Sequence, residues 1–176
     1  MIISHNFGIG LKEYQERGIS NAFPLFDHCP HCHCVSHGNI HRHGFYWRNG
    51  VNDELTVRIP ICRMKCLMCQ TSFSILPDFL LPYFQYTLFT ILSRIKRVLD
   101  GKKNNTYRQL LHFHLKRYLK NLKWIHSYFI DNGSVSGISC DERKEAKKYM
   151  KRILDFGESS FLRRSWGHLS KYFMAH

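Results

Sequence analysis

Two Cys-x-x-Cys pairs constrain this chain of 176 residues more than any other feature of its sequence. Cys29 and Cys32 form the first pair, and Cys66 and Cys69 form the second after 33 intervening residues. A two-residue spacer lets both thiolates of a tight turn point at one ion, and Zn²⁺ binds such thiolates at about 2.3 Å. Four thiolates leave no open coordination position, so the pattern predicts one structural Zn²⁺ and no catalytic metal.

Neighbouring side chains leave the exact ligand set open. Further cysteines and histidines close by could replace or add to one of the four: Cys34, Cys62, His31, His33 and His37. Seven cysteines, with two pairs at metal-binding spacing, favour a reducing compartment over a disulfide framework. Cys140 stands apart, and it is predicted to be a small buried residue near a helix start rather than a reactive thiol.

The segment between the two pairs reads as a β-hairpin. Gly44–Arg48 and Leu55–Ile61 alternate in polarity around the turn-prone dipeptides Asn49-Gly50 and Asn52-Asp53. A hairpin of this size would bring the second pair back over the first, so residues 29–82 are predicted to form a zinc ribbon. Residues 1–28 show no periodic run and are assigned to an N-terminal arm; whether they pack on the ribbon stays open.

Residues 83–176 are predicted to form an all-α domain, which makes the fold class α+β. Pro77 and Pro82 mark the change, because the apolar period lengthens after them. Four helical stretches are expected: Phe84–Leu99, Thr106–Asp131 capped by Thr106, one begun by a Ser139-x-x-Glu142 capping box, and Ser160–Met174. Gly101 and Gly157 are the expected stops of the first and third stretches.

Charge points to a polyanionic partner. The chain holds 26 Lys and Arg against 13 Asp and Glu, for a formal net charge of +13. Residues 1–88 carry only +1 of this excess, whereas residues 89–176 carry +12. Clusters of Lys and Arg bind phosphates by releasing counterions, so the helical half is predicted to bind nucleic acid.

Other classes of protein are disfavoured by the sequence. Met1–Gly10 lacks the pattern of a signal peptide, and the apolar stretch Phe79–Phe84 is too short to span a bilayer. A soluble, cytoplasmic protein without a membrane partner is therefore expected. No paired acid and base, nucleophile with a base, or glycine-rich phosphate loop is present, so an enzyme is not expected.

Three motifs carry a resemblance to a known family: Cys29-Pro30-His31-Cys32, then Arg42-His43-Gly44, then Arg63-x-x-Cys66-x-x-Cys69-x-x-x-Phe73. Together they resemble the amino-terminal zinc ribbon of bacterial insertion-sequence transposases. The resemblance implies that helix-turn-helix segments for DNA binding follow the ribbon. It also implies a bacterial, nucleoid-associated protein that is derived from a mobile element, or that accompanies one with other components of a transposition complex.

The chain departs from the family in two respects. It has no room for the RNase H-like domain whose three carboxylates catalyse transposition, so a non-catalytic protein is expected. The glycine-containing turn that usually separates the two helices of a helix-turn-helix is also absent from Thr106–Asp131.

The predicted function is zinc-dependent binding of nucleic acid, with double-stranded DNA as the preferred ligand. Candidate contacts in the ribbon are Arg42, His43, Arg48, Arg58, Arg63 and Lys65, interleaved with Tyr46 and Trp47. Candidates in the second helical stretch are Arg108, Gln109, His112, His114, Lys116, Arg117, Lys120 and Lys123. Candidates in the third are Lys144, Lys147, Lys148 and Lys151, expected to contact phosphates.

Two alternatives remain. Aromatic and basic residues side by side in the ribbon also suit RNA or single-stranded DNA, whose unpaired bases stack on aromatic rings. An aromatic content of 14% could instead build the interface of a basic subunit in a nucleoprotein complex.

Overall fold

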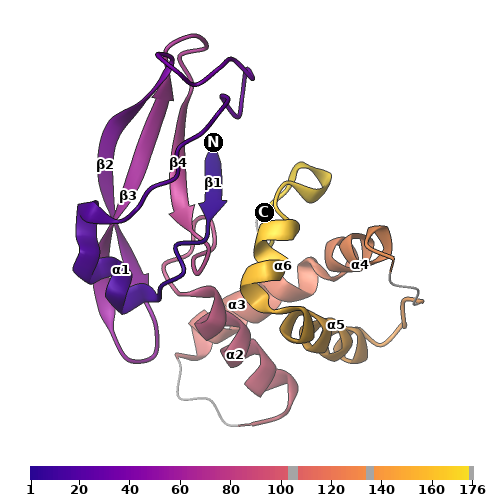
Figure 1. Cartoon of the computed structure of the whole chain (residues 1–176). Coiled ribbons are helices and arrows are strands. Elements are labelled where there is room, and N and C mark those ends of the chain that lie inside the picture. The colour runs from indigo at the N-terminus through magenta and orange to yellow at the C-terminus, as the bar shows by residue number, and fades with distance from the viewer. Residues whose placement is uncertain (103–106, 134–136, 175–176) are drawn as a thin grey trace. The chain divides into compact units, whose positions relative to one another are not determined.

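A mixed four-stranded sheet organises the first of two compact units, Met1–Thr87. The computed structural model describes residues 1–102, 107–133 and 137–174. The strand order is β1-β4-β3-β2; β3 is antiparallel to both β2 and β4, whereas β1 is parallel to β4 (Figure 1). The strands are β1 (Ile2–His5), β2 (Ile40–Val51), β3 (Thr56–Cys66) and β4 (Ser72–Pro77).

The predicted hairpin is present as β2 and β3, and its turn lies at Asn52-Asp53, the second of the two turn-prone dipeptides, rather than at Asn49-Gly50. The side-chain oxygen of Asn52 accepts hydrogen bonds from the backbone N–H groups of Glu54, at 2.9 Å, and Leu55, at 2.7 Å. Such local bonds let asparagine replace a backbone turn, which explains why the chain reverses here. Asn49 and Gly50 continue β2 and pair with Arg58 and Val57.

Residues 1–28 contribute a strand and a helix to the first unit. β1 pairs with β4, and α1 (Leu11–Arg17) buries Leu11 and Tyr14. The Tyr14 hydroxyl donates to the Pro60 carbonyl oxygen of β3 at 2.9 Å, which fixes α1 on the sheet. Gly50 permits this packing, because a Cβ there would lie 2.5 Å from a Leu11 methyl carbon. A short 3₁₀ turn, η1 (Gly18–Ser20), follows α1.

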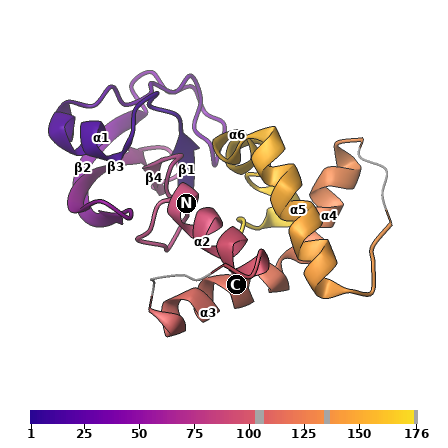
Figure 2. The same cartoon turned by 90° about the horizontal axis from the view of Figure 1, so that it is seen from below.

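The second unit, Leu88–His176, is helical wherever the structure describes regular elements (Figure 2). The α+β class is therefore confirmed. None of the helices in the described residues combines the length and apolar character needed to cross a bilayer. The helices are α2 (Leu88–Leu99), α3 (Arg108–Lys120), α4 (Leu122–Asp131), α5 (Glu142–Phe156), α6 (Glu158–Arg164) and the 3₁₀ turn η2 (His168–Ser170).

The helix boundaries differ from the predicted ones for identifiable reasons. The first helix begins at Leu88 rather than Phe84, because Tyr86 and Thr87 form β-bridges with Val51 and Leu80. The predicted stretch to Asp131 is two helices, separated at Asn121. The predicted cap Thr106 lies outside the described residues. The last stretch is broken as well, because α6 ends at Arg164 before the left-handed Gly167.

Gly101 and Gly157 stop their helices as predicted. Gly101 has φ +74°, and its N–H donates to the Val98 carbonyl oxygen while the N–H of Lys102 donates to that of Arg97. This pair of bonds is a Schellman motif, which favours glycine because the residue must be left-handed. Gly157 likewise has positive φ and forms the C-cap of α5.

Aromatic rings fill the core of the second unit. Trp124, Tyr128 and Phe129 of α4 contact Phe161 of α6, and the Phe161 ring lies 5.1 Å from that of Phe173. The apolar residues of α2 and α5 are buried at most positions. Much of the aromatic content therefore stabilises this unit.

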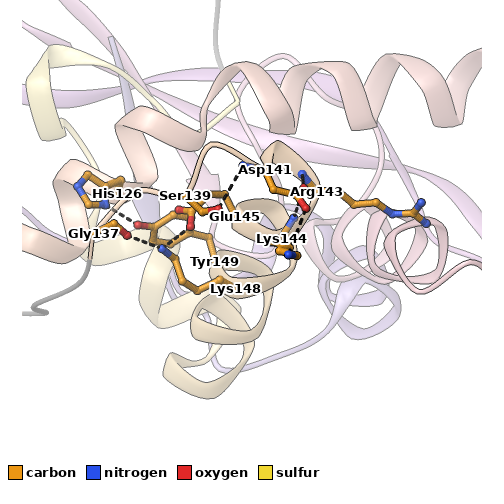
Figure 3. A network of polar contacts seen from close by, with 9 residues as sticks. All are labelled: His126, Gly137, Ser139, Asp141, Arg143, Lys144, Glu145, Lys148 and Tyr149. Atoms are coloured by element: carbon orange, nitrogen blue, oxygen red, sulfur yellow. Dashed lines mark hydrogen bonds and ion pairs between the residues drawn. The ribbon is translucent and has the colours of Figure 1, made fainter.

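The N-cap of α5 is Asp141, which corrects the capping box predicted from Ser139. The Asp141 carboxylate accepts hydrogen bonds from the backbone N–H groups of Arg143, at 3.0 Å, and Lys144, at 3.1 Å (Figure 3). These bonds, that from Lys144 foremost, hold the pKa of Asp141 below its usual value. The Ser139 hydroxyl instead accepts from the N–H of Asp141 at 3.2 Å. The helix therefore begins two residues later than a Ser139 cap would require.

We expect Asp141→Ala to lower the thermal midpoint of the helical unit by a few degrees, because it removes the acceptor for two backbone donors. Ser139→Ala should change the midpoint much less, since its hydroxyl accepts only one exposed N–H. Thermal denaturation followed by circular dichroism compares the two variants. A larger effect of Ser139→Ala would show that the serine caps the helix.

Candidate metal centre and nucleic-acid interface

Four thiols converge at one end of the sheet unit. Their Sγ atoms all lie within 4.8 Å of one another; the four residues are Cys29, Cys32, Cys66 and Cys69. The Sγ atoms of Cys29 and Cys69 are 3.8 Å apart, and those of Cys32 and Cys66 are also 3.8 Å apart. An ion bound tetrahedrally by four sulfurs at about 2.3 Å has sulfur–sulfur edges of about 3.8 Å. The group could therefore hold one metal ion.

The two Cys-x-x-Cys turns have the same local geometry. In each, the N–H of the first cysteine donates to the carbonyl oxygen five residues later: Cys29 to Cys34 at 2.8 Å, and Cys66 to Thr71 at 3.0 Å. In each, the residue after the second cysteine is left-handed, with φ 59° at His33 and 57° at Gln70. Backbone strain of this kind is uncommon in residues other than glycine, and its repetition indicates two matched metal-binding knuckles.

Hydrogen bonds in the second knuckle favour the thiolate form that binds metal. Bonds from the Thr71 side chain and backbone lower the pKa of Cys69 to about 5. A bond from the Cys69 backbone lowers the pKa of Cys66. In the first knuckle, the backbone N–H of His31 points at the Cys29 sulfur from 3.4 Å. These donors compensate negative charge where four thiolates would meet.

The neighbouring candidate ligands separate into two groups. Cys34 remains close, because its sulfur lies 3.6 Å from that of Cys66, so it is still an alternative ligand. Cys62 is buried in β3 with its sulfur 3.7 Å from that of Met64, and burial raises the pKa of its thiol. The candidate histidines are exposed and do not belong to the convergent group of the described residues: His31, His33 and His37.

Cys140 is exposed, so its predicted burial is wrong. It precedes the cap Asp141 rather than lying inside α5, and it therefore has no helix face against which to pack. It lines a hollow of about 420 Å³ together with His126 of α4 and Glu145 of α5.

The predicted basic contacts of the sheet unit are only partly available to a ligand. Arg42, His43 and Arg63 are exposed, and Lys65 is half-buried. The Arg42 guanidinium lies 5.4 Å from the centre of the Phe45 ring, which holds the side chain against the sheet surface.

Arg48 has a structural role instead. Its guanidinium donates to the carbonyl oxygens of Leu81, at 2.9 Å, and Phe84. Burial of this side chain lowers the pKa of Arg48. Sequence patterns do not indicate this role, because the partners are backbone atoms more than thirty residues away.

The α3 candidates are mostly exposed. Exposed positions are Arg108, Gln109, His112, Lys116, Lys120 and, at the start of α4, Lys123. Arg117 is half-buried and donates to the Met174 carbonyl oxygen at 2.9 Å. His114 must be removed from the set, because its side chain is only 1% exposed. Burial and the charge of Arg94 lower the pKa of His114 to about 4, so the ring is neutral near pH 7.

The lysines of α5 are partly neutralised by carboxylates. Lys148 forms an ion pair of 2.6 Å with the buried Glu145 and donates to the Gly137 carbonyl oxygen at 2.9 Å (Figure 3). Lys144 lies 3.8 Å from the Asp141 carboxylate. Lys147 and Lys151 are exposed. They line a hollow that is also lined by Asp100 and Asp155. The positive band predicted for α5 is therefore weaker than its lysine count indicates.

A hollow along α3 and the start of α4 gathers cationic groups without acidic ones. Its volume is about 500 Å³, and no carboxylate is among its lining residues: Phe113, Lys116, Arg117, Lys120, Asn121, Trp124 and Lys171. Sequence reasoning left Lys171 and Phe113 out of the candidate interface. Lys171 comes from the end of the chain, and only the folded structure brings it beside Lys120.

Comparisons with known proteins give one match. A family model described as "Domain of unknown function (DUF6431)" matches residues 29–118, just over half of the chain. The matched segment begins at the first thiol of the metal centre and ends within α3. No curated protein and no solved structure matches the chain. The likeness to transposase ribbons thus rests on the cysteine and arginine motifs alone.

Proposed function

The chain belongs to the family defined by the domain of unknown function DUF6431, and we propose that it is a non-catalytic, zinc-dependent protein that binds double-stranded DNA through its helical unit. The residues of the metal centre and of α3 support this proposal, as do the charges around them.

The observation that carries the proposal is the cationic hollow along α3 and α4. Three lysines and Arg117 line it, and no carboxylate is among its lining residues. Phosphate groups of a nucleic acid backbone are the polyanionic ligands that such clusters bind. Asn121 adds a neutral side chain that can hydrogen-bond to phosphate or sugar oxygens.

A duplex suits the shape of this surface. α3 has thirteen residues and is therefore about 20 Å long, and the major groove of DNA admits a helix. Arg108 and Gln109 are exposed in its first turn, and these residue types can read base edges. Only Asn121 separates α3 from α4, which is shorter than the turn of a typical helix-turn-helix. We therefore assign α3 alone as the helix that reads the bases.

We assign a structural role to the metal and take Zn²⁺ as its identity. Four thiolates suit Zn²⁺, and a closed tetrahedral site has no position for substrate. The ion would join the two knuckles and so fix the long hairpin to the segment that carries Cys29 and Cys32. The ribbon's likeness to transposases supports a place beside a mobile element in the bacterial cytoplasm, with other proteins of a transposition complex as partners.

Competition binding tests the function directly. The zinc-loaded protein is mixed with labelled random-sequence duplex DNA and then with unlabelled duplex, single-stranded DNA or RNA over a salt series. We expect duplex to compete best and the logarithm of the affinity to fall linearly with the logarithm of salt concentration. If single strands displace the duplex more effectively, or if none of the three binds, the proposal is wrong. The second result would favour a protein-interaction subunit.

A further inference from the structure

A hollow in the sheet unit has the composition of a site for unpaired nucleobases. Its volume is about 710 Å³, and its lining combines three aromatic rings with two arginines and no carboxylate: Ile2, Tyr46, Trp47, Arg48, Asn49, Arg58, Tyr83 and Gln85. We propose that it binds the unpaired bases of a single-stranded nucleic acid. This site lies in a different unit from the duplex-binding surface and does not depend on it.

Two of the aromatic side chains are unusually exposed. Trp47 is 53% exposed and Tyr83 is 77% exposed. Rings exposed to water add nothing to the stability of the hydrophobic core. Two exposed rings that line one hollow are instead typical of an interaction site. Such rings are platforms on which bases stack, because every base has an aromatic face.

The register of the hairpin brings a positive charge next to Trp47. Asn49 of β2 pairs with Arg58 of β3, and Trp47 is two residues from Asn49 along the strand. Side chains alternate along a strand, so these three lie on one face of the sheet. Diagonal neighbours of this kind are within reach of each other. Arg58 is exposed and can therefore contact the phosphate next to a base stacked on Trp47.

The backbone holds Tyr83 in an uncommon conformation. Tyr83 has φ +69°, which is rare for a bulky residue. Arg48 donates hydrogen bonds to the carbonyl oxygens of Leu81 and Phe84, on both sides of Tyr83. The loop is thus fixed from inside the unit while its aromatic ring faces solvent. A strained backbone at a residue whose ring is exposed is typical of a ligand-binding site, because the strain does not serve to pack the ring into the core.

The ligand must expose base faces, which a duplex does not do. Stacking on Trp47 and Tyr83 would be sequence-tolerant, and Arg58 would add an interaction with the backbone. DNA and RNA single strands share this chemistry, so both belong in the test.

An abasic oligonucleotide separates base stacking from charge, because it retains the phosphates. We expect the full-length, zinc-loaded protein to bind oligothymidylate or oligouridylate about tenfold more tightly than an abasic strand of equal length. Trp47→Ala and Tyr83→Asn should each weaken binding of the base-containing strand by about tenfold and leave abasic binding unchanged. Asparagine is chosen at position 83 because it tolerates positive φ.

The control variant is Tyr107→Ala, which removes an exposed tyrosine of the second unit and should change neither affinity. Circular dichroism and metal content establish that each variant is folded. Equal affinity of wild-type protein for abasic and base-containing strands would overturn the proposal, as would equal affinity of wild type and Trp47→Ala for oligothymidylate. Duplex affinity, measured in parallel, should be unaffected by Trp47→Ala, so failure here leaves the duplex proposal standing.

Discussion

We expect the replacement of Cys66 and Cys69 together by serine to abolish metal binding and to unfold the sheet unit. Zn²⁺ binding to small structural sites has an apparent free energy of about 10–16 kcal/mol, which is comparable to the whole stability of a small domain, about 5–15 kcal/mol. Cys66 ends β3 and Cys69 lies in the segment joining β3 to β4, so their loss releases the hairpin from the first knuckle. Elemental analysis of wild-type protein should give one zinc per chain, and near-ultraviolet circular dichroism should lose its signal in the variant or after chelation.

Two single-cysteine variants serve as controls. Cys140→Ser should retain the metal, because Cys140 lies outside the convergent group. Cys34→Ser tests the alternative ligand, whose sulfur is 3.6 Å from that of Cys66; we expect it to retain one zinc. A wild-type protein that folds with no metal in the presence of chelator would contradict the structural role.

We expect the second large effect from neutralising the cationic hollow. The triple variant Lys116→Gln, Lys120→Gln, Lys171→Gln removes three charges that line one surface. Each phosphate contact contributes about 0.9 to the slope of log affinity against log salt, so the magnitude of the slope should fall by about 2.7. Affinity for duplex should fall by roughly a hundredfold near 0.1 M salt. Fluorescence anisotropy over a salt series measures both quantities.

A charge-matched control distinguishes this surface from the net charge of the protein. Lys12→Gln, Arg17→Gln, Lys102→Gln also removes three positive charges, but none of these residues lines the hollow, and Arg17 pairs with Glu13 at 2.5 Å. We expect it to retain most of the wild-type affinity. Equal losses in the two triple variants would mean that binding follows total charge, and the hollow would lose its assigned role.

The metal centre and the helices were predictable because their signals are local. Cys-x-x-Cys spacing determines the geometry of a turn whatever surrounds it, and the glycines at 101 and 157 stop helices through their own conformation. The strand pairings beyond the hairpin were not predictable. β1 pairs with β4 across more than sixty residues, and nothing in the sequence of Ile2–His5 indicates its partner.

The interface residues show why charge alone misleads. In the sequence, Arg48 and His114 look like other basic residues near a proposed binding surface. In the fold, Arg48 binds two carbonyl oxygens and His114 is buried. Lys148 is neutralised by Glu145, although a lysine and a glutamate three residues apart could have indicated this pair. Burial depends on tertiary packing. The sequence therefore identifies the basic residues, but it does not distinguish those that are exposed to a ligand from those that are bound inside the fold.

The parallel pairing of β1 with β4 sets the order in which the sheet can form during protein synthesis. Ile2 is translated 72 residues before its partner Ser74. At ~5–20 residues per second, β1 waits roughly 4–14 s for β4 to be made. All four thiols precede β4 in the chain, so the nascent protein can capture its ion before the sheet closes. Once β4 has been made, and until its own β1 pairs with it, the edge of β4 can accept β1 from a neighbouring nascent chain.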